Sequence, residues 1–150
     1  MVGQDDHVIT SLDQVIELWS RTYNTEGRPD WSHILPYYDE QIHFVDSIQE
    51  IRGLNDFRAM VERLTRRSSE LRMHILHALM EERTIFIEWE MTILFRRTRT
   101  SVLHGASRLT LSDKGKIIEQ RDYYDLWGDI LDNVPLVGRL YRGFVRKVFG

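Results

Sequence analysis

Strict alternation of apolar and polar side chains over residues 84–96 is the feature of this sequence that most constrains its fold. In TIFIEWEMTILFR one row of side chains is entirely apolar and the opposite row is mixed. Successive side chains of a strand point to opposite faces, so this pattern predicts a strand with one face on a core. A one-residue shift would turn the apolar row outward, which fixes the phase of the strand. The apolar row is Ile85, Ile87, Trp89, Met91, Ile93 and Phe95.

Three further segments extend this strand into a sheet. Residues 101–111 (SVLHGASRLTL) and 115–124 follow it, separated by the polar turns RRTRT and SDKGK. In residues 101–111 one face carries Leu103, Gly105, Ser107, Leu109 and Leu111. Residues 70–80 (ELRMHILHALM) precede residues 84–96, but both of their rows are largely apolar, so their inward face stays ambiguous.

The first half of the chain has helical signals. Residues 11–24 show capping-box spacing and an apolar stripe of period 3.6, and residues 55–66 show a second stripe. Asp30 is expected to cap a short helix that ends at Leu35, before Pro36. Residues 37–53 are expected to form a strand, a turn and a second short strand. Helices followed by a meander predict an α+β domain with three helices on one face of a curved sheet.

Composition limits the class of protein further. The 150 residues are 42% hydrophobic and 29% charged, which predicts one globular domain over residues 1–150. The absence of cysteine excludes thiolate chemistry. A net charge of −3 argues against a nucleic-acid partner. No basic and apolar leader is evident and no apolar run reaches membrane-span length, so a cytoplasmic location is expected.

Two stretches carry a resemblance to a known superfamily. With YYDEQIHFVDSIQEIRGLNDFRAMVERL early and GKIIEQRDYYDLW late, the chain resembles the nuclear-transport-factor-2-like superfamily. More narrowly it is similar to the SnoaL-like polyketide cyclases and the limonene-1,2-epoxide hydrolases. The resemblance extends to about Leu131. It implies a cone-shaped, antiparallel or mixed sheet closed by helices, a cystatin-like α+β roll with an apolar pocket. Enzymes, carriers and binding modules share this fold, so it leaves function open.

The resemblance implies that Asp122 is the acid/base residue. The segment RDYYDL is close to one that ends the last strand of the epoxide hydrolases, whose first aspartate points into the pocket. Burial in an apolar cavity raises the pKa of a carboxyl, which suits general acid–base catalysis. A structural aspartate that accepts hydrogen bonds from tyrosine or tryptophan is the other interpretation. Alternation would place Ile118, Gln120, Asp122, Tyr124 and Leu126 toward the pocket.

Other family patterns are only partly present. Asp46 resembles the base of the ketosteroid isomerases, but Ser107 stands where those enzymes have a second acid, and Tyr23 matches their tyrosine only approximately. Asp46 is interpreted more simply as the first residue of an Asx turn. The epoxide hydrolases carry an Arg and an Asp where this chain has Trp89 and Met91, so hydration by their route is not expected.

Histidines and cofactor motifs complete the candidates. His77 is a weaker catalytic candidate, expected to face the pocket beside Trp89, whereas His104 is expected on the opposite face of its strand. Neither has a partner at metal-ligand spacing, so no metal is predicted. No glycine-rich phosphate loop occurs, and no cofactor is predicted.

These observations favour a small protein that binds a hydrophobic ligand in an apolar pocket, with Asp122 as the candidate acid/base for an isomerisation, cyclisation or hydration. A non-catalytic ligand-binding or protein-interaction module is the alternative. Trp89, Met91 and Ile93 would form the pocket wall, while Gln120 and Tyr124 orient the ligand. A homodimer is expected through the outer sheet face, as is common in the families that the chain resembles. That face carries Phe86, Leu94, His104 and Tyr123.

Residues 134–150 are a C-terminal extension with an amphipathic pattern. A helix is predicted from Pro135, and its apolar residues recur every three or four positions. Arg139, Arg142, Arg146 and Lys147 occupy the rest of the helix, and the segment has no acid. Packing of the apolar stripe on the domain is the favoured interpretation. Docking on an anionic membrane or on a partner is the alternative.

Overall fold

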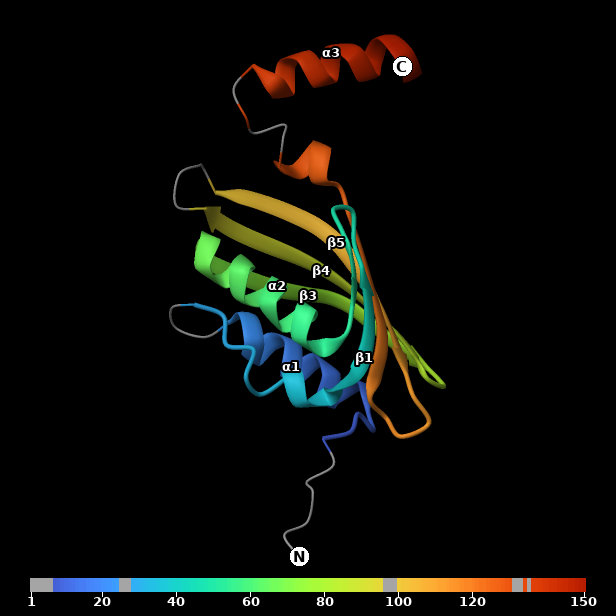
Figure 1. The fold of residues 1–150 in the computed structure, drawn as a ribbon. Coiled ribbons are helices and arrows are strands. Elements are labelled where there is room, and N and C mark those ends of the chain that lie inside the picture. Colours follow the sequence, from blue (N-terminus) through green and yellow to red (C-terminus); the bar gives the residue numbers. More distant parts are fainter. Residues whose placement is uncertain (1–6, 25–27, 96–99, 131–133, 135) are drawn as a thin grey trace, which may run out of the picture.

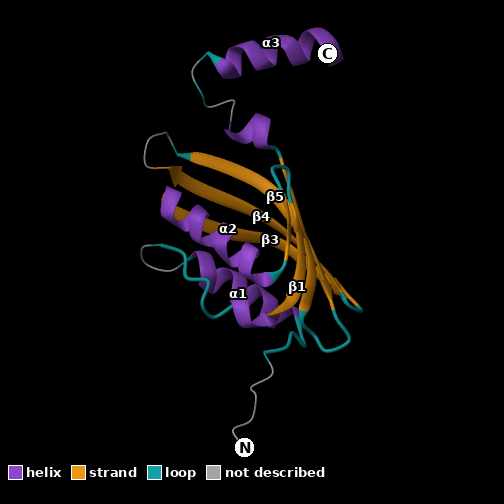
Figure 2. Cartoon of the chain, viewed as in Figure 1, coloured by secondary structure: helices purple, strands orange, loops and turns teal. Residues whose placement is uncertain are grey.

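The computed structural model describes residues 7–24, 28–95, 100–130, 134 and 136–150. A curved six-stranded sheet forms one layer, and helices α1 (Leu12–Tyr23) and α2 (Leu54–Arg67) cover one of its faces (Figures 1 and 2). The remaining elements are η1 (Leu35–Tyr37), η2 (Leu126–Ile130) and a C-terminal helix, α3 (Val137–Phe149). The expected α+β class is confirmed.

The sheet contains both parallel and antiparallel pairs. Its strands are β1 (Tyr38–Val45), β2 (Glu50–Arg52), β3 (Ser68–Glu81), β4 (Thr84–Phe95), β5 (Ser101–Leu111) and β6 (Ile117–Tyr124). They lie in the order β2-β1-β6-β5-β4-β3. Strands β3 to β6 form the expected antiparallel meander, and β1 joins it by pairing parallel to β6. The last strand of the meander therefore lies at the centre of the sheet, flanked on both sides.

Helix α1 forms as its capping residues predict. The N–H of Gln14 donates to Ser11 Oγ at 3.3 Å, and Gln14 Oε1 accepts from the N–H of Thr10 at 2.9 Å. These bonds satisfy backbone donors that a helix start leaves free. Val15 and Trp19 are fully buried against the sheet. The apolar stripe therefore fixes which side of α1 faces the core.

Helix α2 also buries its stripe, although it starts differently. Gly53 precedes it with a φ of +93°, a conformation that a side chain would strain. Phe57 and Val61, one turn apart, are buried under the sheet. Together, α1 and α2 enclose the inner face of β1, β3 and the strands between them (Figure 1).

The predicted short helix from Asp30 to Leu35 is wrong. Residues 32–34 form a turn, and only the 3-10 turn η1 follows. Asp30 Oδ1 does accept a backbone hydrogen bond, from Ser32 at 2.9 Å, but this closes an Asx turn and not a helix. Pro36 sits in the first turn of η1, where its missing N–H costs nothing.

The apolar row of β4 faces the core as predicted, since its described members are nearly inaccessible. The side chain of Phe95 lies outside the described residues, as do residues 96–99 and Pro135. The predicted inner row of β5 is also on the core side: Leu103, Ser107 and Leu109 are buried. Strict period-two patterns were therefore sufficient to orient both strands.

Register shifts break the alternation elsewhere. The register of the β5–β6 pair shifts between Thr110 and Leu111 of β5. This shift places Ile117 of β6 in the core and leaves Ile118 36% exposed. The prediction that Ile118 points inward is therefore wrong, although Gln120 and Asp122 keep the predicted orientation. In β3 a shift between Ile75 and His77 exchanges the two faces of the strand. A bulge of this kind adds a residue without an opposite partner, which sequence alternation does not reveal.

Helix α3 stands apart from the body (Figure 1). Leu140 and Phe144 are 74% and 63% exposed, so the favoured prediction that its stripe packs on the domain is contradicted. A stacked pair of rings, Trp127 on Tyr141, links α3 to η2. Among the helices in the described residues, none is both long and apolar enough to cross a bilayer.

Candidate functional site

A cavity of about 330 Å³ lies between the helices and the inner face of the sheet. Its wall is mostly aromatic and aliphatic, and three polar side chains, Ser107, Gln120 and Asp122, reach it from neighbouring strands. The volume is at the low end of the range for small-molecule sites, roughly 300–1,000 Å³. The apolar wall includes Trp19, Tyr23, Trp31, Phe44, Phe57, Met73, Trp89, Met91, Ile93 and Leu103.

Asp122 is the central acid of this cavity. Ser107 Oγ donates to its Oδ1 at 2.6 Å, and Gln120 Nε2 donates to Oδ1 at 3.0 Å and to Oδ2 at 3.2 Å. The backbone brings these groups together, because Ser107 and Asp122 are directly opposite in the β5–β6 pair. Gln120 is two residues before Asp122 on the same face. The carboxyl therefore points into the cavity, as predicted.

A longer chain of hydrogen bonds holds these partners in place. The indole Nε1 of Trp89 donates to Ser107 Oγ at 2.9 Å, and the hydroxyl of Tyr38 donates to Gln120 Oε1 at 2.6 Å. These bonds orient the two groups that contact the carboxyl. Ser107 Oγ accepts from Trp89 and donates its own proton to Asp122, and Gln120 Oε1 accepts from Tyr38 while its amide N–H groups donate to Asp122. Strands β1, β4, β5 and β6 thus all contribute to the orientation of one carboxyl.

Burial changes the protonation of Asp122. Its removal from bulk water raises its pKa to about 6, although the hydrogen bonds from Ser107 and Gln120 act in the opposite direction. The negative charge of Asp46 adds to the increase. The carboxyl nevertheless keeps some accessible surface, because it faces the hollow of the cavity and not solid core. Both protonation states are therefore populated near neutral pH, which is the condition for exchanging a proton.

Gly105 makes space for Trp89, the first donor in this chain of hydrogen bonds. It lies opposite Trp89 in the β4–β5 pair. A Cβ atom at this position would lie 2.6 Å from Cζ2 of Trp89 and 2.6 Å from the carbonyl oxygen of Tyr123. The indole therefore covers the backbone of β5 at close range, and its N–H reaches Ser107 only because residue 105 has no side chain.

Asp46 forms the expected Asx turn and also reaches the cavity wall. Its Oδ1 accepts from the N–H groups of Ile48 and Gln49, both at 2.8 Å, which closes the expected Asx turn. Its Oδ2 accepts from the hydroxyl of Tyr124 at 3.2 Å, at the cavity wall. Burial and the charge of Asp46 raise the pKa of Tyr124, so its phenol stays protonated.

Tyr23 and Tyr38 are further phenols near Asp122. Burial raises the pKa of both well above the ordinary tyrosine value, and the charge of Asp122 adds to this effect. Tyr23 lines the cavity, as predicted. Neutral phenols are hydrogen-bond donors, and they stabilise negative charge without carrying any themselves.

The open side of the cavity is basic. Arg63 and Arg67, one turn apart on α2, both line it and are exposed. Ile48, from the turn between β1 and β2, is 64% exposed beside them, and Leu126 of η2 also reaches the lining. These residues define the rim of the cavity.

His77 does not face the cavity, so that prediction is wrong. Its side chain is 84% exposed on the outer face, where Nδ1 lies 2.7 Å from Glu88 Oε2. The register shift after Ile75 is the cause, because it places His77 opposite Glu88 and not opposite Trp89. His104 lies outward as expected, 3.2 Å from Glu90.

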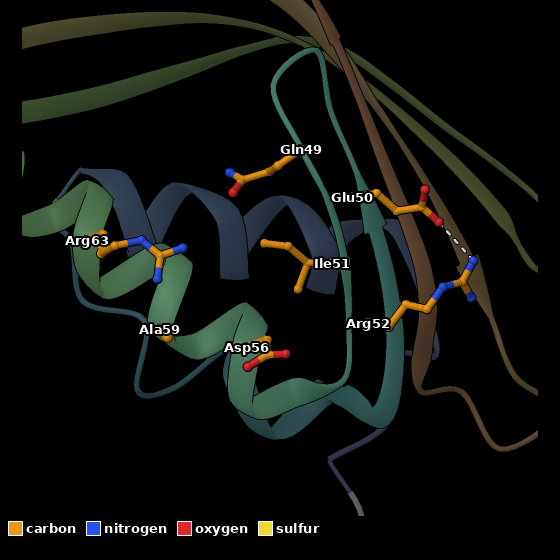
Figure 3. Close-up of a pocket in the computed structure, with 7 residues that line it drawn as sticks. All are labelled: Gln49, Glu50, Ile51, Arg52, Asp56, Ala59 and Arg63. Carbon is orange, nitrogen blue, oxygen red and sulfur yellow. Dashed lines mark hydrogen bonds and ion pairs between the residues drawn. The ribbon is translucent and has the colours of Figure 1, made fainter.

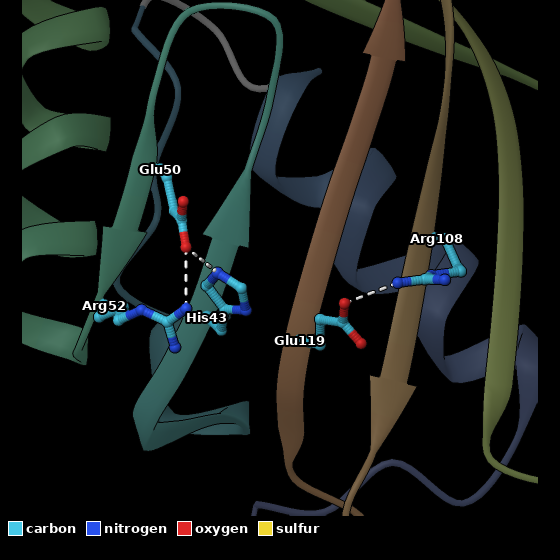
Figure 4. A network of polar contacts seen from close by, with 5 residues as sticks. All are labelled: His43, Glu50, Arg52, Arg108 and Glu119. Atoms are coloured by element: carbon cyan, nitrogen blue, oxygen red, sulfur yellow. Dashed lines mark hydrogen bonds and ion pairs between the residues drawn. The ribbon is translucent and has the colours of Figure 1, made fainter.

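Polar clusters also occur outside the cavity. Figure 4 shows Glu50 accepting from both His43 and Arg52 at 2.8 Å, and Arg108 donating to Glu119 at 2.6 Å. The hydrogen bonds from His43 and Arg52 lower the pKa of Glu50. Glu50 and Arg52 are exposed, whereas His43, Arg108 and Glu119 are 29%, 32% and 34% exposed. None of these pairs reaches the cavity, so they are interpreted as surface stabilisation.

A second hollow, of about 620 Å³, lies between β2 and α2. Figure 3 shows that Gln49, Ile51 and Arg63 surround it with no convergence of polar groups on one point. It is shallow and open, and its charged side chains extend into solvent. Among the described residues, no three His, Asp or Glu side chains are grouped to hold a metal ion.

Sequence reasoning missed two residues that shape the site. Tyr38 begins β1, and its link to Gln120 depends on the parallel β1–β6 pairing, which no local pattern indicates. Gly105 was recognised only as a member of the inner row of β5, although a glycine inside a strand is a known signal of close packing. The sequence therefore contained a signal for the role of Gly105 but none for the role of Tyr38.

Comparison with known proteins agrees with this architecture. A structure from Catenulispora acidiphila, described as a hypothetical protein with a ketosteroid isomerase-like fold in complex with trimethylamine, has a TM-score of 0.70 at 13% identity, over 82% of this chain and 93% of that one. An LEH-like epoxide hydrolase from M. tuberculosis has a TM-score of 0.65 at 15% identity, over 89% and 94%. At these identities the likeness shows the fold alone.

A third structure comes from a Jannaschia species and is named for a proposed SnoaL-like polyketide cyclase activity. It has a TM-score of 0.59 at 18% identity, over 83% of this chain and 92% of that one. Among curated protein sequences none matches significantly. The family model of the SnoaL-like domain matches residues 12–120, which include both helices that enclose the cavity and most of the sheet. The chain therefore belongs to the SnoaL-like domain family.

Proposed function

We propose that the protein binds a small, mainly apolar molecule in the 330 Å³ cavity and transfers a proton to or from it through Asp122, without a cofactor. The observation that supports this most directly is a cavity-facing carboxyl whose pKa burial raises to about 6. Isomerisation, cyclisation and hydration all need such a group. A general acid or base of this kind contributes roughly 10²–10⁴-fold to a rate.

The hydrogen bonds around Asp122 define its part in the reaction. Its Oδ1 already accepts from Ser107 and Gln120, whereas Oδ2 accepts only a weaker bond from Gln120 at 3.2 Å. Oδ2 is thus the oxygen with remaining capacity for a ligand or a water molecule. The hydroxyl of Tyr124, which lines the same cavity, is the second polar group within reach of a bound ligand.

The basic rim suggests the polarity of the ligand. A molecule that fills the apolar cavity would have its inner end at Asp122 and its outer end near Arg63 and Arg67. Arginine pairs well with carboxylate and other oxygen-rich groups. The preferred ligand is therefore an amphipathic molecule with a compact apolar body and an acceptor or anionic group at the outer end.

A non-catalytic ligand-binding module is the second candidate. The observation in its favour is the same network, because Ser107 and Gln120 would also hold a purely structural aspartate. In that case the cavity would bind a ligand and leave it unchanged.

Turnover by Asp122→Asn distinguishes the two candidates. The wild-type protein would be tested for hydration of a small epoxide and for isomerisation of a β,γ-unsaturated cyclic ketone, with product detected by chromatography. Asp122→Asn should reduce the rate by about 10²-fold or more while the ligand still binds. Glu88→Gln, on the outer face of β4, is the matched control and should leave the rate unchanged. Equal rates in wild type and Asp122→Asn would contradict the catalytic proposal.

A homodimer through the outer sheet face is part of the same proposal. Leu79, Phe86 and Tyr123 are 56%, 41% and 47% exposed on this face, which gives an apolar patch among the charges. Aromatic residues within a polar surround are typical of protein interfaces. Light scattering at micromolar concentration should report twice the chain mass, and Phe86→Asp should reduce it to one. A wild-type monomer would contradict this proposal.

A further inference from the structure

Helix α3 separates its apolar and basic side chains onto opposite halves of its surface. At 3.6 residues per turn, successive side chains are about 100° apart, and the apolar ones fall within an arc of roughly 180°. The basic side chains fall in the opposite arc, where Gly143 also lies. The apolar half consists of Val137, Leu140, Tyr141, Phe144, Val145, Val148 and Phe149. The basic residues are Arg139, Arg142, Arg146 and Lys147.

Most of the apolar half is uncovered. Leu140, Phe144 and Phe149 are 74%, 63% and 81% exposed. Contact with the body covers only part of this half, where Tyr141 stacks on Trp127 with ring centroids 5.8 Å apart and Gly138 is buried. By contrast, the stripes of α1 and α2 are closed by the sheet. A helix of this composition needs a further surface to cover it.

The charge of α3 limits which kind of surface could cover its apolar half. Residues 134–150 contain four cations and no acid, a charge of +4, so the rest of the chain carries −3 − 4 = −7. The covering surface must accept apolar side chains along one line and offer negative charge beside it. A bilayer offers an apolar acyl region with anionic headgroups directly beside it. The long stems of arginine and lysine allow their charges to reach those headgroups.

Neither of the two hollows among the described residues offers a comparable site for the helix of a second copy. A protein groove for α3 would need apolar walls along about 20 Å, the length of thirteen residues. The 330 Å³ cavity is apolar but internal, and the hollow between β2 and α2 is lined mainly by polar and charged side chains such as Glu50, Arg52 and Asp56. Neither matches the exposed half of α3.

We infer that α3 docks on anionic lipid bilayers, with the exposed side chains of its apolar half in the acyl boundary. This orientation turns the cavity rim toward the lipid, because Leu126 lines the cavity and the next residue, Trp127, stacks on α3. The exposed Ile48 and the cations Arg63 and Arg67 line the same cavity as Leu126. The acidic body then points away from the negative surface.

Sedimentation with large unilamellar vesicles tests this inference on the full chain. Vesicles of equal parts phosphatidylcholine and phosphatidylglycerol should bind the protein, and vesicles of phosphatidylcholine alone should not. Leu140→Ser combined with Phe144→Ser removes the stripe, and Arg139→Gln, Arg146→Gln and Lys147→Gln together remove charge but keep good helix formers. Each set should weaken binding at least tenfold, since each cation contributes about fivefold.

Control variants and melting temperatures exclude trivial explanations. Leu76→Ser removes a side chain that is 40% exposed on β3, and Lys114→Gln removes a cation from an exposed turn. Both should bind vesicles like wild type, and all variants should keep its melting temperature because the changed side chains are exposed. Absence of binding to anionic vesicles at low salt would overturn the inference. Equal binding to phosphatidylcholine alone, or binding that survives both sets of α3 changes, would overturn it too.

Discussion

The two faces of strands β4 to β6 carry the same kinds of side chain in opposite surroundings. On the outer face, Glu88 lies beside His77 and Glu119 beside Arg108, in contact with solvent. On the inner face, Asp122 has no cation beside it among the described residues and accepts hydrogen bonds from neutral groups. Burial raises the pKa of Asp122 to about 6. The pKa of a carboxyl on these strands thus depends on the face that it occupies, not on its residue type alone.

The comparison also shows how the inner face is kept rigid. Outer contacts join long, partly exposed side chains, whose ordering costs conformational entropy and whose charges are screened by water. The inner groups form a connected chain from Trp89 through Ser107 to Asp122. In a buried network each member restricts the next, so changing one should affect the others. Changes on the inner face should therefore have larger effects than changes on the outer face.

Gly105→Ala should have the largest effect. The new methyl group would collide with the indole of Trp89 and with the carbonyl of Tyr123, and overpacking of this kind costs about 3 kcal/mol of the free energy of unfolding. Urea denaturation would measure the loss. Gly143→Ala makes the same chemical change in α3, where nothing lies within 4 Å of the added Cβ, and should not destabilise the protein. Equal midpoints for the two variants would show that Trp89 does not need this space.

Asp122→Asn should change the pH dependence of stability. Because the folded pKa is raised, the folded state holds its proton up to about pH 6, whereas the unfolded carboxyl ionises near pH 4. Stability is therefore full below about pH 4 and decreases as the pH rises through 6. At about pH 8 the variant should exceed wild type by about 1–3 kcal/mol, and near pH 4 the difference should vanish. Thermal melts at both pH values test this, and a difference that is constant with pH would contradict it.

Ser107→Ala should have an intermediate effect of two kinds. The buried N–H of Trp89 loses its acceptor, at a cost of about 1–2 kcal/mol in the free energy of unfolding. Asp122 loses a donor that favours its charged form, so its pKa should rise above about 6. Carboxyl titration by NMR would follow the second effect. If the pKa of Asp122 is the same in the variant as in wild type, the hydrogen bond between these residues is not a determinant of its charge.

Glu88→Gln should have the smallest effect. It weakens the contact with His77, but both side chains are more than half exposed, so the free energy of unfolding should change by less than about 0.5 kcal/mol. The melting temperature at neutral pH would check this. A loss as large as that of Ser107→Ala would mean that the two faces are less different than their burial indicates.

Local patterns in the sequence determined much of the fold and part of the site. The alternation in β4 and β5 oriented both strands, because a reversed phase would expose a full row of apolar side chains. The capping residues and stripe of α1 placed that helix within a residue of its bounds. Asp122, Gln120 and Tyr124 were assigned to the cavity from alternation together with the family resemblance. Register shifts limited this reasoning, since it placed both Ile118 and His77 on the wrong face.

The tertiary structure decided what no segment contains by itself. The parallel pairing of β1 with β6 brings Tyr38 to Gln120, two residues 82 positions apart in the chain. Burial of Asp122 depends on side chains from two helices and at least four strands, and it sets the pKa of that carboxyl. Helix α3 shows the same limit: its sequence determines an apolar half, but only packing decides whether that half is covered. Periodicity depends on neighbouring residues, whereas burial and protonation depend on distant ones that the fold brings together.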